Sequence, residues 1–249
     1  METDRRKENN MAEKTAVVTG ASSGIGAEIA KCLCEDGIAV YGIGRDFSGT
    51  QYENPLFHKI PLDLRERETI CGFVNELKEN NVCVDILVNC AGAAFYGLHE
   101  NLRPEQISDM VRVNVEAPLL LTSLLLKDLR QQKGVIINIS SVTAKSGRNS
   151  HGAAYGATKA ALSSFGSSLF EEVRKHGVKV CTIHPDLTDT ALYRNADFTV
   201  SGEQMSCLAA AEVAETAMGC IHARDGMVFT DITVRPSLNV IVKKRGEQA

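Results

Sequence analysis

The sequence predicts a single doubly wound α/β domain, and three observations lead to this prediction. Short β-branched runs alternate with helical patterns along the chain, which is typical of βαβ units around a parallel sheet. A glycine-rich stretch follows the first of these runs and opens a helix. No linker, internal repeat or low-complexity tract divides the 249 residues. Ligands of such sheets bind beyond the carboxyl ends of the strands, so the loops there form the candidate site.

The β-branched runs predict seven strands. They are expected at 14–19, 38–43, 56–60, 84–88, 134–139, 178–183 and 227–234. The strands and the helices between them place a single domain at 13–236. A disordered tail is expected at 1–12, and a second tail at 237–249.

The stretches between the strands predict helices with recognisable start and stop signals. The first helix runs from the glycine-rich stretch to about 36, where Gly37 stops it. Pro104 sits where another helix would begin, and that pattern continues to about 132 with an interruption near Pro118. Further helices are expected at 65–80 and 209–223 and around Tyr155 and Lys159, whereas 186–206 is expected to be irregular.

Composition and charge exclude several classes of protein. The chain is 44% hydrophobic and 23% charged, as in ordinary globular domains, and its net charge of −4 argues against a nucleic-acid partner or an anionic membrane surface. Small molecules are therefore the expected partners. The eight cysteines form no C-x-x-C pair, which indicates buried thiols in a reducing compartment. The most apolar stretch, 118–126, is too short to span a bilayer, and the charged N-terminus is no signal peptide, so we expect a cytoplasmic protein.

The glycine-rich stretch after the first strand predicts a nucleotide site. Glycines at such a turn let backbone N–H groups approach a pyrophosphate, and the helix N-terminus adds a partial positive charge. Glycines also simply make turns, so the position after the first strand carries the argument. The residues expected to bind the cofactor here are Gly20, Ser22, Ser23, Gly24, Ile25 and Gly26.

The end of the second strand predicts a preference for NADP(H) over NAD(H). An NAD-selective fold usually places an acidic residue there, whereas this chain has Gly44, Arg45 and Asp46. Arg45 could clamp a 2′-phosphate through charge-assisted hydrogen bonds worth about 1.5–3 kcal/mol. The alternative is a solvated Arg45 with Asp46 as the ribose ligand. Asp63, after the third strand, could accept a hydrogen bond from the adenine amine or cap the next helix.

Tyr155 and Lys159 form the candidate acid/base pair. Four residues apart on a helix, their side chains project from the same face. An adjacent ammonium favours the phenolate, so with a cationic cofactor ring in a dry cleft we expect the pKa of Tyr155 to lie below its ordinary value of about 10. The alternative is an exposed tyrosine stacked on a lysine stem.

Several ordered motifs resemble those of the single-domain short-chain dehydrogenases/reductases, in their NADP-preferring branch. They are the segment from Thr19 to Gly26, the run Asn89-Cys90-Ala91-Gly92, and Asn114, Ser141, Tyr155 and Lys159. The resemblance covers about 14–235. It implies a Rossmann-type, seven-stranded parallel sheet with helices on both faces, in a homodimer or homotetramer.

The resemblance also implies roles for named residues. Tyr155 would be the general acid/base, Lys159 would lower its pKa and hold the nicotinamide ribose, Ser141 would polarise the substrate oxygen, and Asn114 would hold a water in a proton relay. Ser140 is the alternative to Ser141, because the Ser141–Tyr155 spacing is one residue longer than the commonest in the family. No metal is expected. Further cofactor-binding residues would be Asp63, Leu64, Asn89, Ala91, Gly92, Tyr155, Lys159, Pro185, Thr188 and Thr190, although Asn89 is interpreted as mostly structural.

The substrate is only broadly predicted. The walls of the substrate site are expected from 93–96, 142–144, His151 and 187–205. The apolar side chains of 187–205 suit a moderately apolar alcohol or ketone. The alternative is that they only pack this loop against the body of the protein. Asp186 stands where the family usually has glycine, and its role is open. Candidate reactions are the oxidoreduction of a hydroxysteroid, bile acid, or small hydroxy acid or ketone, or the reduction of a 3-oxoacyl thioester. A non-catalytic dinucleotide-sensing scaffold is the alternative from another class.

Overall fold

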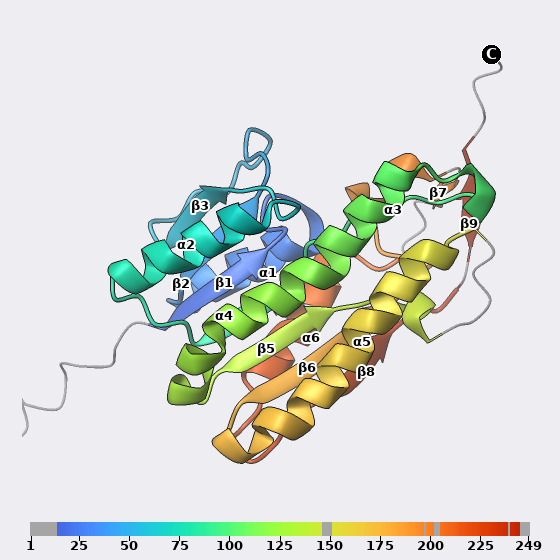
Figure 1. Ribbon diagram of the computed structural model, residues 1–249. Helices are drawn as coiled ribbons and strands as arrows, with labels where there is room; N and C mark the ends of the chain where they lie inside the picture. The colour runs from blue at the N-terminus through green and yellow to red at the C-terminus, as the bar shows by residue number, and fades with distance from the viewer. Residues whose placement is uncertain (1–13, 146–150, 197, 202–204, 239, 245–249) are drawn as a thin grey trace, which may run out of the picture.

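A seven-stranded parallel sheet forms the centre of the computed structural model, in the order β3-β2-β1-β4-β5-β6-β8 (Figure 1). The structure describes residues 14–145, 151–196, 198–201, 205–238 and 240–244, so the predicted tail at 1–12 lies outside the described residues. The predicted seven strands are confirmed, although the last begins only at Asp231. They are β1 (Thr15–Thr19), β2 (Ala39–Gly44), β3 (Phe57–Pro61), β4 (Ile86–Asn89), β5 (Val135–Ile139), β6 (Lys179–Pro185) and β8 (Asp231–Val234).

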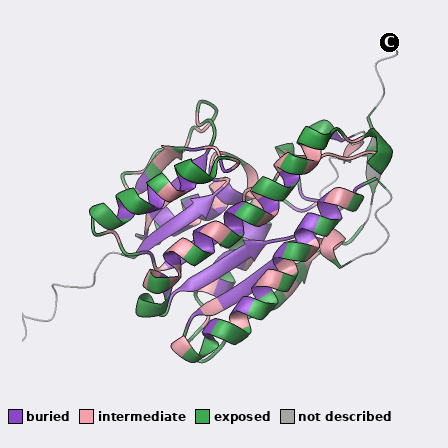
Figure 2. Cartoon of the chain, viewed as in Figure 1, coloured by how far each residue is buried: buried purple, intermediate pink, exposed green. Residues whose placement is uncertain are grey.

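Helices cover both faces of this sheet (Figure 1). On one face α1 (Gly24–Glu35) packs beside α6 (Ala210–Ile221), and on the other lie α2 (Arg67–Glu79), α4 (Ala117–Gln132) and α5 (Ala153–Val173). Successive strand residues point to opposite faces, so Val17 and Val18 belong to two different apolar clusters. Figure 2 shows the result, with buried strands between helices that are exposed on their outer sides.

The long helical region contains a π-helical turn. It consists of α3 (Pro104–Val111), a π turn at Arg112–Glu116 and α4. The predicted interruption near Pro118 therefore lies just before that residue. Pro118 has no N–H to donate to the carbonyl of Asn114, four residues earlier. The turn places the Asn114 side chain in the interior, where it is 0% exposed.

A second, two-stranded sheet corrects the predictions for 186–206 and 237–249. Strand β7 (Phe198–Val200) pairs antiparallel with β9 (Ile241–Lys243), and the amide of Leu238 donates to the carbonyl of Met205 at 2.9 Å. Part of the predicted C-terminal tail thus packs onto the predicted irregular loop. Two three-residue strands some forty residues apart leave no local periodicity to detect.

Short helical turns complete the described chain. They are η1 (His99–Asn101), η3 (Val142–Ala144), η4 (Arg174–His176) and η5 (Ala191–Asn195). Among the described residues, no helix is both long enough and apolar enough to cross a membrane.

Candidate active site

A cleft of about 560 Å³ opens at the carboxyl ends of the strands. It is lined by the loops after β1, β2, β3, β4, β5 and β6 and by the N-terminal part of α5. Of the predicted cofactor residues, the cleft brings together Gly20, Ser22, Ser23, Gly24, Ile25, Gly26, Arg45, Asp63, Leu64, Ala91, Gly92, Tyr155, Lys159, Pro185, Thr188 and Thr190.

The glycine-rich turn leaves room that a side chain would fill. Gly20 has φ +72°, and a Cβ there would lie 2.9 Å from the Ala91 Cα atom. A Cβ on Gly26 would lie 2.3 Å from the Gly20 carbonyl oxygen. Ser23 precedes α1 without capping it through its side chain, so the first N–H groups of the helix remain for another acceptor. The turn therefore fits a pyrophosphate.

Asp63 is paired with a cleft residue that the sequence analysis missed. Its Oδ2 atom lies 2.6 Å from Arg65 Nη2, and Arg65 Nη1 lies 3.1 Å from Asp109 Oδ2. The hydrogen bond from Arg65 is the main cause that lowers the pKa of Asp63. Asp63 does not cap α2, which corrects one of its two predicted roles, because Glu66 precedes that helix. The Arg65 guanidinium is thus held between two carboxylates.

Arg45 and Asp46 lie at the mouth of the cleft, and both are exposed. The carboxylate of Asp46 accepts hydrogen bonds from the amide of Ser48 at 2.8 Å and from its hydroxyl at 2.9 Å. These bonds, the backbone one first, hold the pKa of Asp46 below its usual value. Asp46 is therefore already engaged in a local turn, whereas Arg45 adds positive charge near Asp63.

Tyr155, Lys159 and Ser141 meet at the inner end of the cleft. The Lys159 amine donates to the Ile139 carbonyl at 2.9 Å and lies 5.9 Å from the centroid of the Tyr155 ring. The Ser141 hydroxyl oxygen accepts from the amide and the hydroxyl of Thr143, at 3.2 and 2.9 Å. All three of these predicted catalytic side chains are more than nine-tenths buried.

Burial opposes the expected pKa shift of Tyr155. Desolvation raises its pKa above the ordinary value, Tyr193 adds to the rise, and a hydrogen bond with Ser141 opposes it. Burial also lowers the pKa of Lys159 to about 8, against an opposing contribution from Cys90. In the protein alone desolvation thus outweighs the lowering by the Ser141 hydrogen bond, and the expected lowering of the Tyr155 pKa, which also invoked a cationic cofactor ring, stays a prediction.

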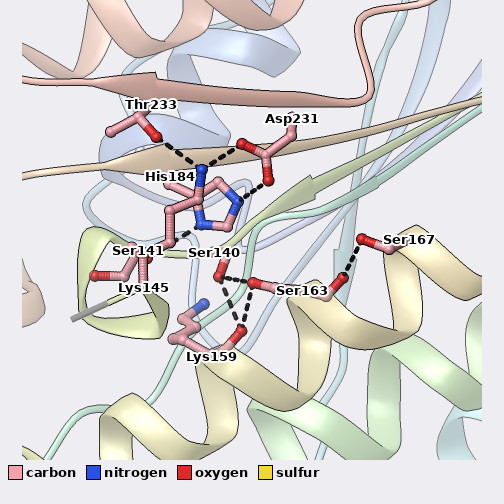
Figure 3. A network of polar contacts seen from close by, with 9 residues as sticks. All are labelled: Ser140, Ser141, Lys145, Lys159, Ser163, Ser167, His184, Asp231 and Thr233. Carbon is pink, nitrogen blue, oxygen red and sulfur yellow. Dashed lines mark hydrogen bonds and ion pairs between the residues drawn. The ribbon is translucent and has the colours of Figure 1, made fainter. Parts of the chain in front are cut away.

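Ser140 and Ser141 point to different neighbours. Figure 3 shows the Ser140 hydroxyl directed at α5, where it bonds to the Lys159 carbonyl at 2.9 Å and to Ser163 Oγ at 2.8 Å. The hydroxyl of Ser141 is the one that interacts with Tyr155. The geometry therefore favours Ser141 over Ser140 as the residue facing a substrate.

Two predicted asparagines lie behind the cleft rather than in it. Asn114 accepts from the Ala93 amide at 2.8 Å and donates to the Ala93 carbonyl at 2.8 Å and to Thr158 at 2.9 Å. Asn89 donates to Asn138 Oδ1 at 2.9 Å. Neither lines the cleft, and the buried position of Asn89 agrees with its interpretation as a mostly structural residue.

At the substrate end, Tyr193 lines the cleft, and the rings of Tyr96 and Phe198 pack against it. Tyr96 lies 5.6 Å from Tyr155, 6.2 Å from Tyr193 and 5.1 Å from Phe198, measured between ring centroids. Lys244, after β9, donates to the Tyr193 carbonyl at 2.9 Å. His151 is exposed and lies outside the cleft, as do residues 142–144, which corrects their placement in the substrate wall. Asp186 lines the cleft, accepts from the Leu187 amide at 2.9 Å and lies 3.6 Å from Arg235.

The comparison with protein families identifies this arrangement. The model of the family described as short chain dehydrogenase matches residues 14–199. The chain belongs to the short-chain dehydrogenase/reductase family. It is 33% identical, over 90% of its length and 97% of the relative's, to an uncharacterized oxidoreductase of Staphylococcus epidermidis.

Solved structures show the same short-chain dehydrogenase fold. A 4-hydroxyisoleucine dehydrogenase complexed with NADH has a TM-score of 0.78 at 21% identity, over 90% of this chain and 97% of the other. A protein called ElxO, with NADP bound, has a TM-score of 0.77 at 21% identity, over 89% and 97%. At these identities the likeness concerns the fold alone.

Among the residues of this short-chain dehydrogenase that line the cleft, Arg65 and Asp109 were missed by sequence reasoning. Their only local signal is the Asp63-Leu64-Arg65 run, because Asp109 lies 44 residues beyond Arg65. In the part of the chain that the structure describes, no group of three or more His, Cys, Asp or Glu side chains could hold a metal ion.

Proposed function

We propose that the protein is an NADP(H)-dependent oxidoreductase that interconverts a secondary alcohol and a ketone, with Tyr155 as general acid/base. One observation carries this proposal. The buried Tyr155 and Ser141 lie at one end of the same cleft whose other end is the glycine-rich turn. A dinucleotide held at that turn would supply or accept the hydride beside these two hydroxyls.

In the reductive direction, the two hydroxyls act on the substrate oxygen. The Ser141 and Tyr155 hydroxyls would donate hydrogen bonds to it as negative charge develops, and Tyr155 would transfer its proton. The raised pKa of Tyr155 keeps the phenol protonated at neutral pH, which suits an acid. In the oxidative direction Tyr155 must accept the proton, and the positive charge of an oxidised nicotinamide would favour its phenolate.

Lys159 and Asn114 would support the proton path. With a pKa of about 8, the Lys159 amine exchanges its proton readily near neutral pH. The Asn114 side chain has both N–H groups engaged, by Ala93 and Thr158. A relay water would therefore bind the main-chain carbonyl of Asn114, which the proline at 118 leaves without its α-helical donor.

The preference for NADP(H) rests on which charged side chains of the cleft are free to contact the 2′-phosphate or the ribose of the cofactor. The Arg65 guanidinium is neutralised by Asp63 and Asp109, and the Asp46 oxygens are taken by Ser48. Arg45 is exposed at the cleft mouth, near Asp63, where a 2′-phosphate would lie.

The aromatic residues at the substrate end support an apolar substrate. The ring of Tyr193, held by Tyr96 and Phe198, would suit a hydroxysteroid or bile acid, or a small hydroxy acid or ketone. A 3-oxoacyl thioester is the second candidate. We also propose that the enzyme is cytoplasmic and works as a homodimer or homotetramer.

Initial rates with NADPH and NADH test the proposal over a panel of ketosteroids, oxo acids, 3-oxoacyl esters and diketones. We expect turnover that favours NADPH and disappears in Tyr155→Phe, while that variant still binds NADPH by fluorescence titration. Binding without turnover across the panel would instead identify a dinucleotide-sensing scaffold. A preference for NADH would contradict the role of Arg45.

A further inference from the structure

Both ends of the turn η3 are tied to one carboxylate on the edge strand β8 (Figure 3). At one end, the Lys145 ammonium binds Asp231 Oδ1 and donates to Thr233 Oγ1 at 2.9 Å. At the other end stands His184, whose Nε2 atom lies 3.0 Å from Asp231 Oδ2 and whose Nδ1 atom lies 3.2 Å from the Ser141 carbonyl oxygen. A closed ring of contacts thus surrounds the turn that presents the Ser141 hydroxyl.

Both partners of His184 are hydrogen-bond acceptors. The Ser141 carbonyl and the Asp231 carboxylate each require an N–H on the imidazole ring. A neutral imidazole has one N–H and can serve one of them, whereas the imidazolium serves both. Burial acts to raise the pKa of Asp231, but Lys145 and His184 together hold it below its usual value. The fully buried His184 side chain thus connects the Ser141 carbonyl to this carboxylate.

The Ser141 peptide connects this ring of contacts to the catalytic hydroxyl. Its carbonyl also accepts from the Ala144 amide at 3.0 Å, within the turn. Its side chain accepts from Thr143, and its backbone is extended, with φ −166° and ψ 156°. A rotation of this peptide would move the hydroxyl away from Tyr155. The bond from His184, on strand β6 between β5 and β8, holds the peptide against that rotation.

We propose that His184 is a positioning residue. Its Nδ1–H holds the Ser141 peptide, and its Nε2 atom connects that peptide to Asp231 on β8, which also binds Lys145. This inference rests on the proposed function, because the position of Ser141 affects turnover only if its hydroxyl meets a substrate. A displacement of about 1 Å at a reacting group can lower turnover about 100-fold.

Two substitutions separate the two contacts of His184. His184→Asn places an amide N–H near the position of Nδ1 and can keep the bond to Ser141. His184→Gln places it near Nε2 and can keep only the bond to Asp231. His222→Gln is the matched control, because His222 also pairs with a carboxylate, Asp36 at 2.8 Å, but is 57% exposed and lies outside the cleft.

Steady-state kinetics with the best substrate of the panel give the first readout. We expect His184→Asn and His222→Gln to keep kcat within about threefold of the wild type, and His184→Gln to lower it about 10- to 100-fold. The dissociation constant for NADPH should change less than about twofold in all three, because the bonds of His184 go to Ser141 and Asp231 rather than to the glycine-rich turn. Equal kcat values in the two His184 variants would overturn the inference.

Hydrogen–deuterium exchange gives a second readout that does not depend on turnover. The Ala144 amide donates to the same Ser141 carbonyl, so we expect it to exchange faster in His184→Gln than in the wild type, His184→Asn or His222→Gln. Unchanged exchange in His184→Gln would overturn the inference even in an active enzyme. If the wild type turned over no substrate but the Ala144 amide still exchanged faster in His184→Gln, the proposed function would be refuted, while the contact between His184 and Ser141 would stand.

Discussion

The amine of Lys159 lies 5.9 Å from the centroid of the Tyr155 ring, and both side chains are at most 3% exposed. Burial acts on the two groups in opposite senses, because it disfavours the charged form of each. The pKa of the amine falls to about 8, and the pKa of the phenol rises. At neutral pH the pair is therefore a protonated phenol beside an amine that titrates near neutral pH.

The buried amine should make the free energy of unfolding depend on pH. The pKa of Lys159 is about 8 in the folded state and 10.5 ordinarily, so the unfolded state binds more protons between these values. Stability attributable to this group therefore rises with pH, by about 1 kcal/mol between pH 7 and 9. Urea unfolding of the wild type and Lys159→Met at both pH values measures the difference. Identical pH dependence in the two proteins would contradict a buried, ionisable amine.

Substitution of Ser141 should lower kcat, whereas substitution of its neighbour Ser140 should lower stability. Ser141→Ala removes the hydroxyl that we propose faces the substrate, and we expect kcat to fall about 100-fold or more with the Tm little changed. Ser140→Ala removes bonds to α5 and should cost about 1 kcal/mol of stability while retaining most of kcat. Steady-state kinetics and thermal unfolding of both variants make the comparison, and the reverse pattern would assign the catalytic role to Ser140.

Replacing Arg45 should weaken the binding of NADPH selectively. Loss of a charge-assisted contact with a 2′-phosphate is worth about 1.5–3 kcal/mol, so Arg45→Ala should raise the Kd for NADPH about 10- to 150-fold. The Kd for NADH should stay the same, since NADH has no 2′-phosphate. Arg67→Ala is the control, because that arginine is 66% exposed on α2 and lies outside the cleft. A parallel loss for both cofactors would point to a structural role for Arg45.

Two glycine-to-alanine changes should have opposite effects on the Tm. A Cβ on Gly26 would lie 2.3 Å from the Gly20 carbonyl, so Gly26→Ala should destabilise the protein by about 1–3 kcal/mol and abolish cofactor binding. A Cβ on Gly72, within α2, would meet nothing within 4 Å. Gly72→Ala should therefore stabilise the protein by about 0.5–1 kcal/mol. Calorimetry of both variants measures the contrast, and an unchanged Tm in Gly26→Ala would show that the turn can relax.

Local patterns in the sequence predicted the sheet and the residues gathered at its carboxyl end. The glycine-rich turn after β1 and the spacing of Tyr155 and Lys159 are short-range features, so they could be recognised directly. The Arg65–Asp109 and His184–Asp231 contacts join residues 44 and 47 positions apart, and nothing local marks them. The rise in the pKa of Tyr155 in the protein alone could not be predicted, because it depends on burial, which only the packed structure determines.

The pairing of β7 with β9 connects the C-terminal part of the described chain to the substrate end of the cleft. Through Lys244, the segment that includes β9 holds the backbone of Tyr193 and Arg194, both of which line the cleft. Tension applied to the chain beyond Lys244, by a fused partner or by attachment to a surface, would reach that wall directly. The same connection makes β9 a place for a fluorescent reporter, whose signal would follow movement of the wall when a ligand enters.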